Sequence, residues 1–427
     1  MILGLSLAYN AYTLHQKIFQ SRMDKQQQQE QEQEQQSKEK YQQENETQKN
    51  LQQAKLNQPQ TQENQQEEQE ILENEIELFL QKATSRNLRS KLQKFLPKFK
   101  WELQISAFSD HEQVIITDKN NLLQKLKNMK KDGIDHLQIV SDFDQTVTPF
   151  HHNQKMSPST LGAVRICEDT PEFLKKELEK NFKYYYPIEQ DPTIETEHKV
   201  KYMQEWNEKV GEAFKKSGIT GEIFQKCADK ANFAVRHLFK EFFILCSQVN
   251  LPFFYVSGGI NAFVHTILDQ ITDINQYDNL FLNSQKAIFD KHQNQLIDMH
   301  MEVCTSSKHE ILNKEIYDFK KNTILLGDSQ HDILMGGNIE AENQISILFL
   351  NEKLADNIKD FQLEGWDIII RDPTGQGSYI VALQILQEIG LKEFQKEKYD
   401  ITLKSHKNIF QSKENYKEIN EILCQLA

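Results

Sequence analysis

The stretch Leu137-Gln-Ile-Val-Ser-Asp-Phe-Asp-Gln-Thr-Val-Thr148 decides the fold of this chain. A short apolar run bounded by polar residues is typical of a strand buried in a parallel sheet, and ligand sites in such sheets lie beyond the carboxyl ends of the strands. We therefore expect Asp142 and Asp144 at the mouth of a crevice. Two close carboxylates repel each other unless a cation lies between them, and Mg²⁺ prefers oxygen ligands. Taken alone, an Asp-x-Asp pair is also common in turns and helix caps.

Length and composition exclude several classes of protein. The chain has 427 residues, enough for two or three domains, and a formal net charge of −13. That charge argues against a nucleic-acid partner held by phosphate neutralisation. The five cysteines form no Cys-x-x-Cys pair, which argues against a zinc site and favours a reducing, cytoplasmic location. The apolar start, Met1 to Tyr9, lacks basic residues and is too short to span a bilayer, so we do not expect a membrane partner.

Residues 1–70 form a low-complexity arm dominated by Gln and Glu. Such a segment cannot bury enough apolar surface to offset the entropy lost on ordering, so we expect a disordered or loosely helical arm. A protein partner bound through this arm is the functional alternative.

Beyond the arm, apolar strand patterns alternate with helical ones, which predicts a Rossmann-like parallel α/β sheet. The strand patterns lie at 137–141, 251–256, 279–283, 323–327, 345–350 and 366–371. About a hundred residues of mostly helical pattern separate the first two strands and predict an inserted helical cap. Within the cap, the segment 184–192 contains two prolines and is expected to form a turn. The predicted division is 71–150 and 236–391 for the core, 151–235 for the cap, and 392–427 for a polar tail without assigned structure.

Polar residues whose side chains can react or bind a ligand follow several of the predicted strands. They are Asp142 and Asp144, then Ser257 with Gly258, then Lys308 near the start of a helix, and finally Asp328 and Asp332. Taken singly, a serine at a strand end is usually a cap, a lysine a solvated charge, and Gly-Asp-Ser a turn. Together they supply what phosphoryl transfer needs. A carboxylate can act as nucleophile, a second carboxylate can protonate the leaving oxygen, and a metal, a lysine and neutral donors can surround the charged phosphoryl group.

These residues match the four motifs of the haloacid-dehalogenase-like phosphatases. Four longer stretches narrow the match, and these are Ser141-Asp-Phe-Asp-Gln-Thr-Val147, Tyr185-Tyr-Pro-Ile-Glu-Gln-Asp-Pro192, Tyr202-Met-Gln-Glu-Trp206 and Leu326-Gly-Asp-Ser-Gln330. In these stretches the chain resembles the cytosolic pyrimidine 5′-nucleotidases (type III), in one colinear order from about residue 114 to 386.

The resemblance implies a role for each motif residue. Asp142 would attack phosphorus and form an aspartyl-phosphate, and Asp144 would act as general acid and then as general base. The ligands of Mg²⁺ would be Asp142, the backbone carbonyl of Asp144, and Asp328, with Asp332 supporting them. The phosphate would be bound by Ser257, Gly258 and Lys308, and Glu189 in the cap would hydrogen-bond the base.

The sequence departs from the family pattern at three places. Ser257-Gly-Gly-Ile-Asn-Ala262 stands where the family usually has Ser-Ala-Gly-Ile-Gly-Asp, and His331 stands where it usually has glycine. Val210 stands where the family has a substrate-contacting serine. The change at Val210 bears on base preference and not on the implied nucleophile, acid or metal ligands.

The resemblance implies a Mg²⁺-dependent 5′-nucleotidase acting on nucleoside 5′-monophosphates, either pyrimidine nucleotides such as CMP and UMP or 7-methyl-GMP. Two alternatives stay open at this point. One is a phosphatase of the same fold acting on another small phosphomonoester. The other is a catalytically silent scaffold that works through the Gln/Glu-rich arm.

Overall fold

The structure, a computed structural model, describes residues 103–191, 194, 196–290, 294–304, 308–314, 317–351, 364–390 and 413–426. The predicted arm at 1–70 lies outside these residues, and so does the part of the predicted tail from 392 to 412.

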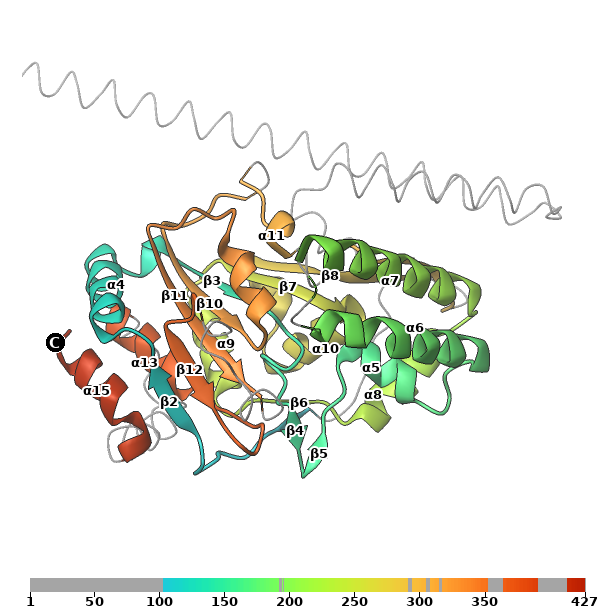
Figure 1. Ribbon diagram of the computed structural model, residues 1–427, viewed down its shortest axis with the longest axis horizontal. Helices are drawn as coiled ribbons and strands as arrows, with labels where there is room; N and C mark the ends of the chain where they lie inside the picture. The colour runs from blue at the N-terminus through green and yellow to red at the C-terminus, as the bar shows by residue number, and fades with distance from the viewer. Residues whose placement is uncertain are drawn as a thin grey trace, which may run out of the picture. The chain divides into compact units, whose positions relative to one another are not determined.

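An eight-stranded sheet forms the centre of the described chain (Figure 1), with the order β2-β12-β11-β10-β3-β7-β8-β9. The strands are β2 (Gln113–Ile116), β3 (Leu137–Ser141), β7 (Phe253–Ile260), β8 (Leu280–Phe289), β9 (Leu296–His300), β10 (Asn322–Gly327), β11 (Asn343–Leu350) and β12 (Ile368–Arg371). The strands from β12 to β8 pair in parallel, and β2 and β9 add antiparallel edges. The prediction of a Rossmann-like parallel sheet is confirmed.

Both faces of this sheet are buried, which explains why its strands are apolar without alternation. Successive strand residues point to opposite faces, so Ile139 packs in one apolar cluster and Val140 in another. The helices that contribute side chains to the first cluster include α4 (Lys119–Asp132), α9 (Phe239–Gln248), α10 (Asn261–Ile271) and α13 (Ile380–Ile389). The second contains Met335 and Trp366, next to α11 (Lys308–Ile311) and the 3₁₀ helix η5 (Gln330–Gly336). Each fully buried Ile or Leu stabilises this fold by about 1.5–3 kcal/mol.

Between β3 and β7, four further helices precede α9. They are α5 (Thr160–Ile166), α6 (Glu172–Gln190), α7 (Thr196–Lys216) and α8 (Gly221–Ala231). α6 and α7 lie side by side (Figure 1). Two small sheets complete the described structure, a parallel pair of β1 (Gln104–Ile105) with β6 (Ala234–Val235) and an antiparallel pair of β4 (His151–His152) with β5 (Lys155–Met156).

The turn predicted for 184–192 is wrong, because α6 continues through Pro187 to Gln190. Proline removes one helical hydrogen bond and crowds the preceding turn. Here it lies in the last turn, and apolar packing offsets the cost. Tyr185 is buried and stacks on Trp206 of α7 with ring centroids 5.8 Å apart, and Ile188 packs beside them. The helix ends at Gln190, and its C-cap residue Asp191 stands immediately before the second proline of the segment.

The end of the predicted polar tail is part of the core. Its helix α15 (Lys417–Cys424) follows the 3₁₀ helix η7 (Glu414–Tyr416) and packs on α4, α13 and β2. Its buried apolar side chains are Ile419, Ile422, Leu423 and Leu426. This spacing of three, four and seven residues is that of one helical face, and it is visible in the sequence although we assigned no structure to the tail.

Glu112, just before β2, joins this C-terminal segment to the core through a buried carboxylate. The side chain is 1% exposed and accepts hydrogen bonds from the Tyr416 hydroxyl at 2.9 Å, the Ser378 hydroxyl at 3.1 Å and the Ser378 backbone N–H. Burial raises the pKa of the Glu112 carboxyl to about 7, although these hydrogen bonds oppose the shift.

Replacing Glu112 with glutamine should therefore flatten the pH dependence of stability. Because the folded-state pKa is raised, this group's contribution is complete below its ordinary value of 4.5 and is lost as the pH rises to about 7. The loss is at most about 3 kcal/mol, taking about 1.4 kcal/mol per pKa unit. Chemical unfolding at pH 5 and pH 8 measures it, with Asp110→Asn as the control at an exposed neighbouring carboxylate. An equal fall in the free energy of unfolding from pH 5 to pH 8 in wild type and Glu112→Gln would contradict the assignment of this pH dependence to Glu112.

Candidate active site

The loop after β3 brings two carboxylates to the carboxyl edge of the sheet. The backbone N–H of Asp142 continues the pairing with β10 by donating to Leu326 O at 3.0 Å. The chain then turns back, because the N–H groups of Thr146 and Val147 donate to Phe143 O at 3.3 and 2.9 Å. Phe143 itself is buried against Tyr255, so it anchors the loop while both aspartates face the cavity described below.

Lys308 lies between two buried aspartates. Its Nζ donates to Asp142 Oδ1 at 2.7 Å and to Asp332 Oδ1 at 2.6 Å, and the exposed fraction of the three side chains is at most 7%. Burial raises the pKa of Asp142 to about 7 although Lys308 pulls it down. Burial also disfavours the charge of Asp332, but Lys308 and the backbone N–H groups of Asp328 and Ser329 hold its pKa below the usual range.

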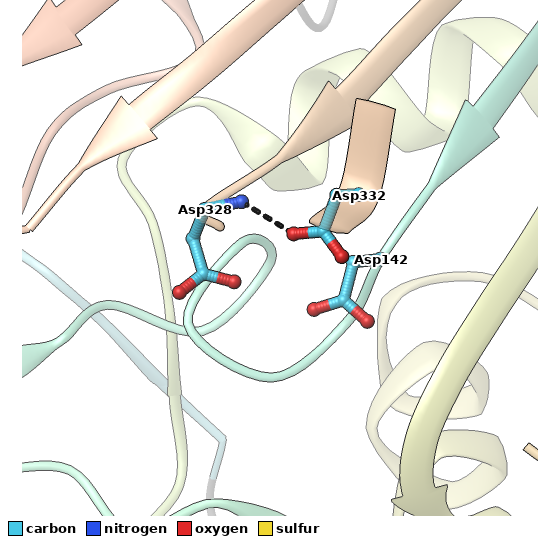
Figure 2. A group of neighbouring side chains, drawn as sticks. All are labelled: Asp142, Asp328 and Asp332. Atoms are coloured by element: carbon cyan, nitrogen blue, oxygen red, sulfur yellow. Dashed lines mark hydrogen bonds between the residues drawn. The ribbon is translucent and has the colours of Figure 1, made fainter. Parts of the chain in front are cut away.

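Figure 2 shows the carboxylates of Asp142, Asp328 and Asp332 gathered at this edge. One carboxylate oxygen from each lies within 4.8 Å of the others. Among the described residues, the carboxylate of Asp328 accepts hydrogen bonds from two neutral donors, the Thr146 hydroxyl at 3.3 Å and the Asn351 amide at 3.1 Å. Burial and the two neighbouring aspartates raise the pKa of Asp328 well above its ordinary value. Three carboxylates share one lysine charge, so this set of hard oxygen ligands suits a divalent cation.

Asp144 points to the start of α5. Its carboxylate accepts from the Thr160 backbone N–H at 3.0 and 3.1 Å and from the Thr160 hydroxyl at 3.0 Å. A helix N-terminus offers unpaired N–H groups to an anion. Burial nevertheless outweighs these bonds and raises the pKa of Asp144 to about 6. Near neutral pH this group can therefore both give and take a proton.

Ser257 and Gly258, in the second half of β7, line the same cavity as the acidic cluster. The Ser257 hydroxyl accepts the Gly259 backbone N–H at 3.1 Å and is fully buried, whereas Gly258 is exposed. Gly259 leaves no room for a side chain, because a Cβ there would lie 2.6 Å from Thr160 Oγ1 and 3.1 Å from Asp144 Oδ2. This close approach brings the backbone of β7 beside Asp144 and Thr160.

One cavity of about 360 Å³ connects the acidic cluster with the helices α6 and α7. All the predicted site residues line it, and these are Asp142, Asp144, Glu189, Ser257, Gly258, Lys308 and Asp328. Its helical side adds the aromatic rings of Phe182, Tyr186 and Trp206. The first two stack with ring centroids 4.7 Å apart. A cavity with a charged end and an aromatic end can hold a phosphate group joined to a flat ring system.

The departures from the family pattern fall partly inside this cavity. Val210 and His331 line it. Asn261 instead accepts the backbone N–H of Ala287 in β8 at 3.0 Å, so its side chain serves the packing of α10 against the sheet. Of the two tyrosines that precede Tyr186, Tyr184 is 59% exposed and Tyr185 is buried against Trp206 of α7.

Sequence reasoning missed three residues around the site, which are Thr160, Asn351 and Arg236. Asn351 follows β11 directly, so the rule that strand ends carry site residues could have found it. Thr160 follows Ser159 at the start of a helix, a common capping pattern with no special signal. Arg236 stands alone in an apolar stretch, and its contacts become visible only in the fold.

Among the residues that the structure describes, no helix is long and apolar enough to cross a membrane.

Comparisons with known proteins agree with this geometry. The model of the family described as pyrimidine 5′-nucleotidase (UMPH-1) matches residues 145–390, more than half of the chain. The 7-methylguanosine phosphate-specific 5′-nucleotidase of Homo sapiens is 28% identical over 57% of this chain and 82% of its own length. Its Drosophila melanogaster counterpart is 30% identical over 56% of this chain and 76% of its own. The crystal structure of cytosolic 5′-nucleotidase IIIB bound to cytidine is 26% identical, with a TM-score of 0.56 over 66% of this chain and 94% of that one.

The resemblance drawn from the sequence motifs is thereby confirmed, together with the haloacid-dehalogenase-like fold and the reading of the chain as an enzyme. The chain belongs to the pyrimidine 5′-nucleotidase family and is a phosphoric monoester hydrolase of the 5′-nucleotidase type.

Proposed function

We propose that this protein hydrolyses nucleoside 5′-monophosphates to nucleoside and phosphate, with Asp142 as the nucleophile. The observation that carries the proposal is the single cavity that joins Asp142, Asp144 and Lys308 to Glu189 and an aromatic wall. In the first step a bond forms between Asp142 and phosphorus while the bond to the 5′-oxygen breaks and Asp144 gives that oxygen a proton. In the second, water attacks phosphorus and gives a proton to Asp144 while the bond from phosphorus to the Asp142 oxygen breaks, which releases phosphate and restores the Asp142 carboxylate.

The binding groups follow from the same cavity. Ser257, Gly258 and Lys308 hold the phosphoryl oxygens. We propose that Mg²⁺ is held by Asp142, the backbone carbonyl of Asp144 and Asp328, with Asp332 keeping Lys308 in place. When bound, the ion would stabilise the negative charge of the transferring group. The proton transfers belong to Asp144, whose pKa of about 6 supports both roles.

The substrate is a pyrimidine nucleotide such as CMP or UMP, or 7-methyl-GMP. The cytidine-bound relative supports the first and the two relatives named for 7-methylguanosine phosphate support the second. We also propose that residues 151–235 act as a cap over a core of 71–150 and 236–391, because side chains from both line the cavity. The cytosolic relative and the five cysteines without a Cys-x-x-Cys pair support a cytoplasmic location.

Phosphate release from CMP, UMP, 7-methyl-GMP and phosphoserine, with Mg²⁺ and with EDTA, tests this function. We expect turnover of at least one nucleotide, little turnover of phosphoserine and none in EDTA. Preference for phosphoserine would instead support a phosphatase of another small phosphomonoester. No turnover of any of these substrates would instead favour the catalytically silent scaffold.

Glu189→Ala should change discrimination among bases far more than it changes the chemistry. An ionised carboxylate only accepts hydrogen bonds, so Glu189 suits a base that presents an amino or ring N–H group. Loss of a bond to a charged group costs about 1.5–3 kcal/mol, which is about 10–100-fold in kcat/KM for the preferred nucleotide. Hydrolysis of p-nitrophenyl phosphate, which has no base, should change less than about threefold.

The matched control is Glu177→Ala, which removes a carboxylate from the same helix outside the cavity lining, where Glu177 pairs with Lys180. It should leave the ratios of kcat/KM unchanged. A uniform drop for CMP, UMP, GMP and p-nitrophenyl phosphate in Glu189→Ala would place Glu189 outside the base site.

A further inference from the structure

Arg236 is a buried arginine whose hydrogen bonds within the described part of the chain all end on neutral oxygens. Its side chain is 1% exposed, and the guanidinium lies over the Phe349 ring, 4.6 Å from the centroid. Nε donates to Thr146 O at 2.9 Å, and Nη2 donates to Gln145 O at 2.6 Å and to Asn351 Oδ1 at 3.2 Å. Nη1 donates to Gln376 O at 2.6 Å and to Gly377 O at 3.4 Å. Burying a guanidinium costs desolvation free energy, and here all of its N–H groups are directed to acceptors. This arrangement suggests a specific role for Arg236.

Two of these hydrogen bonds hold the loop that follows Asp142 and Asp144. Gln145 directly follows Asp144 and adopts φ 65°, a left-handed conformation that costs a residue with a side chain about 1–2 kcal/mol. Arg236 holds the carbonyl of this strained residue and that of the next one. The forked geometry of the guanidinium suits two neighbouring acceptors in a way that a single ammonium does not.

A third bond leads to Asp328 through Asn351. The Asn351 amide accepts from Arg236 with its oxygen and donates to Asp328 Oδ2 at 3.1 Å with its nitrogen. The other carboxylate oxygen, Oδ1, accepts the hydroxyl of Thr146, whose carbonyl Arg236 also holds. Both oxygens of Asp328 are therefore oriented by residues that Arg236 keeps in place.

We infer that Arg236 is a positioning residue of the phosphatase site, which fixes the loop after Asp144 and aims the carboxylate of Asp328 at the cation position. The inference rests on the proposed function for its consequence in catalysis. The competing interpretation is that Arg236 only stabilises the fold, as a buried charge can anywhere in a protein.

The pair Lys125–Asp367 provides a matched control for that competing interpretation. Lys125 Nζ lies 2.7 Å from Asp367 Oδ1, and Asp367 is 5% exposed. Asp367 precedes β12, so this pair lies at the amino edge of the sheet, opposite the site. Lys125→Met therefore removes a charge that is hydrogen-bonded to a buried partner without touching the cavity.

The test measures Mn²⁺ binding directly, by the electron paramagnetic resonance signal of the free ion, together with thermal unfolding. Arg236→Met should weaken Mn²⁺ binding at least about tenfold, since groups that orient metal ligands typically affect affinity 10–100-fold. Lys125→Met should lower the melting temperature without changing Mn²⁺ affinity. Arg236→Lys, which keeps the charge but not the fork, should fall between wild type and Arg236→Met. Unchanged Mn²⁺ affinity in a folded Arg236→Met protein would overturn the inference.

A double-mutant cycle decides whether Arg236 acts through Asn351, and it uses Arg236→Lys so that it does not depend on the folding of Arg236→Met. Asn351→Ala and Arg236→Lys should each weaken Mn²⁺ binding, and the double variant should be no weaker than the weaker single variant. Additive losses would reject the route through Asn351, and full Mn²⁺ affinity in Arg236→Lys and Arg236→Met alike would reject the positioning role. Because these experiments measure metal binding, their outcome does not depend on the phosphate-release assay with nucleotides. Absence of turnover in that assay would reject only the proposed reaction.

Discussion

Replacing Asp142 with asparagine is expected to reduce phosphate release by at least about 10⁴-fold, as loss of a covalent nucleophile does in other enzymes. An amide oxygen cannot attack phosphorus to form an acyl phosphate. The fold should survive, because the change relieves repulsion with Asp328 and Asp332, and Lys308 keeps its 2.6 Å contact with Asp332. Steady-state phosphate release and thermal unfolding measure the two effects.

Asp135→Asn is the matched control, since Asp135 is an exposed carboxylate at the amino end of the same strand. It should keep wild-type turnover. Acid quenching with ³²P-labelled substrate should trap radioactivity on the wild-type protein and none on Asp142→Asn. Near wild-type turnover of Asp142→Asn would remove the covalent mechanism.

Replacing Asp144 with asparagine should produce a loss that depends on the leaving group. A positioned acid or base contributes about 10²–10⁴-fold, and an asparagine amide can neither donate nor accept the proton. Nucleotides leave as a poorly stabilised 5′-alkoxide and need the proton, so their first step should slow by this factor. p-Nitrophenolate leaves without a proton, so its first step should stay fast while hydrolysis of the aspartyl-phosphate slows.

Rapid mixing with p-nitrophenyl phosphate measures this difference. Asp144→Asn should show a burst of about one p-nitrophenol per active site, followed by slow turnover, whereas the wild type should turn over without such a pause. Equal slowing of nucleotides and p-nitrophenyl phosphate, with no burst, would assign the acid–base role to another group.

The sheet and the cavity-lining residues could be predicted because they obey local rules. The apolar run at 137–141 reads as a strand in any context, and the carboxyl ends of parallel strands meet at one edge of the sheet. For this reason Asp142, Ser257 and Asp328, far apart in sequence, line one cavity. The roles assigned to them stay predictions until the variants are measured.

The remaining features depend on packing that no short stretch of sequence contains. Pro187 lies in a helix because Tyr185 stacks on a tryptophan twenty-one positions later, and a turn rule based on prolines cannot include that contact. Arg236 is one basic residue among fifty, and its contacts form only because the fold brings three loops together around it. The pairing of Glu112 with Tyr416 joins residues 304 positions apart.

The hydrogen bond between Glu112 and Tyr416 cannot form until the C-terminal segment has been synthesised. β2 and α4 are synthesised among the first described segments, yet α15, which packs on both, is synthesised last. At about 5–20 residues per second, Glu112 waits roughly 15–60 s for Tyr416. During that time an edge strand and an apolar helix face are available to other chains. Synthesis of α15, rather than formation of the sheet, therefore ends the period in which β2 and this face of α4 are exposed to aggregation and to chaperones.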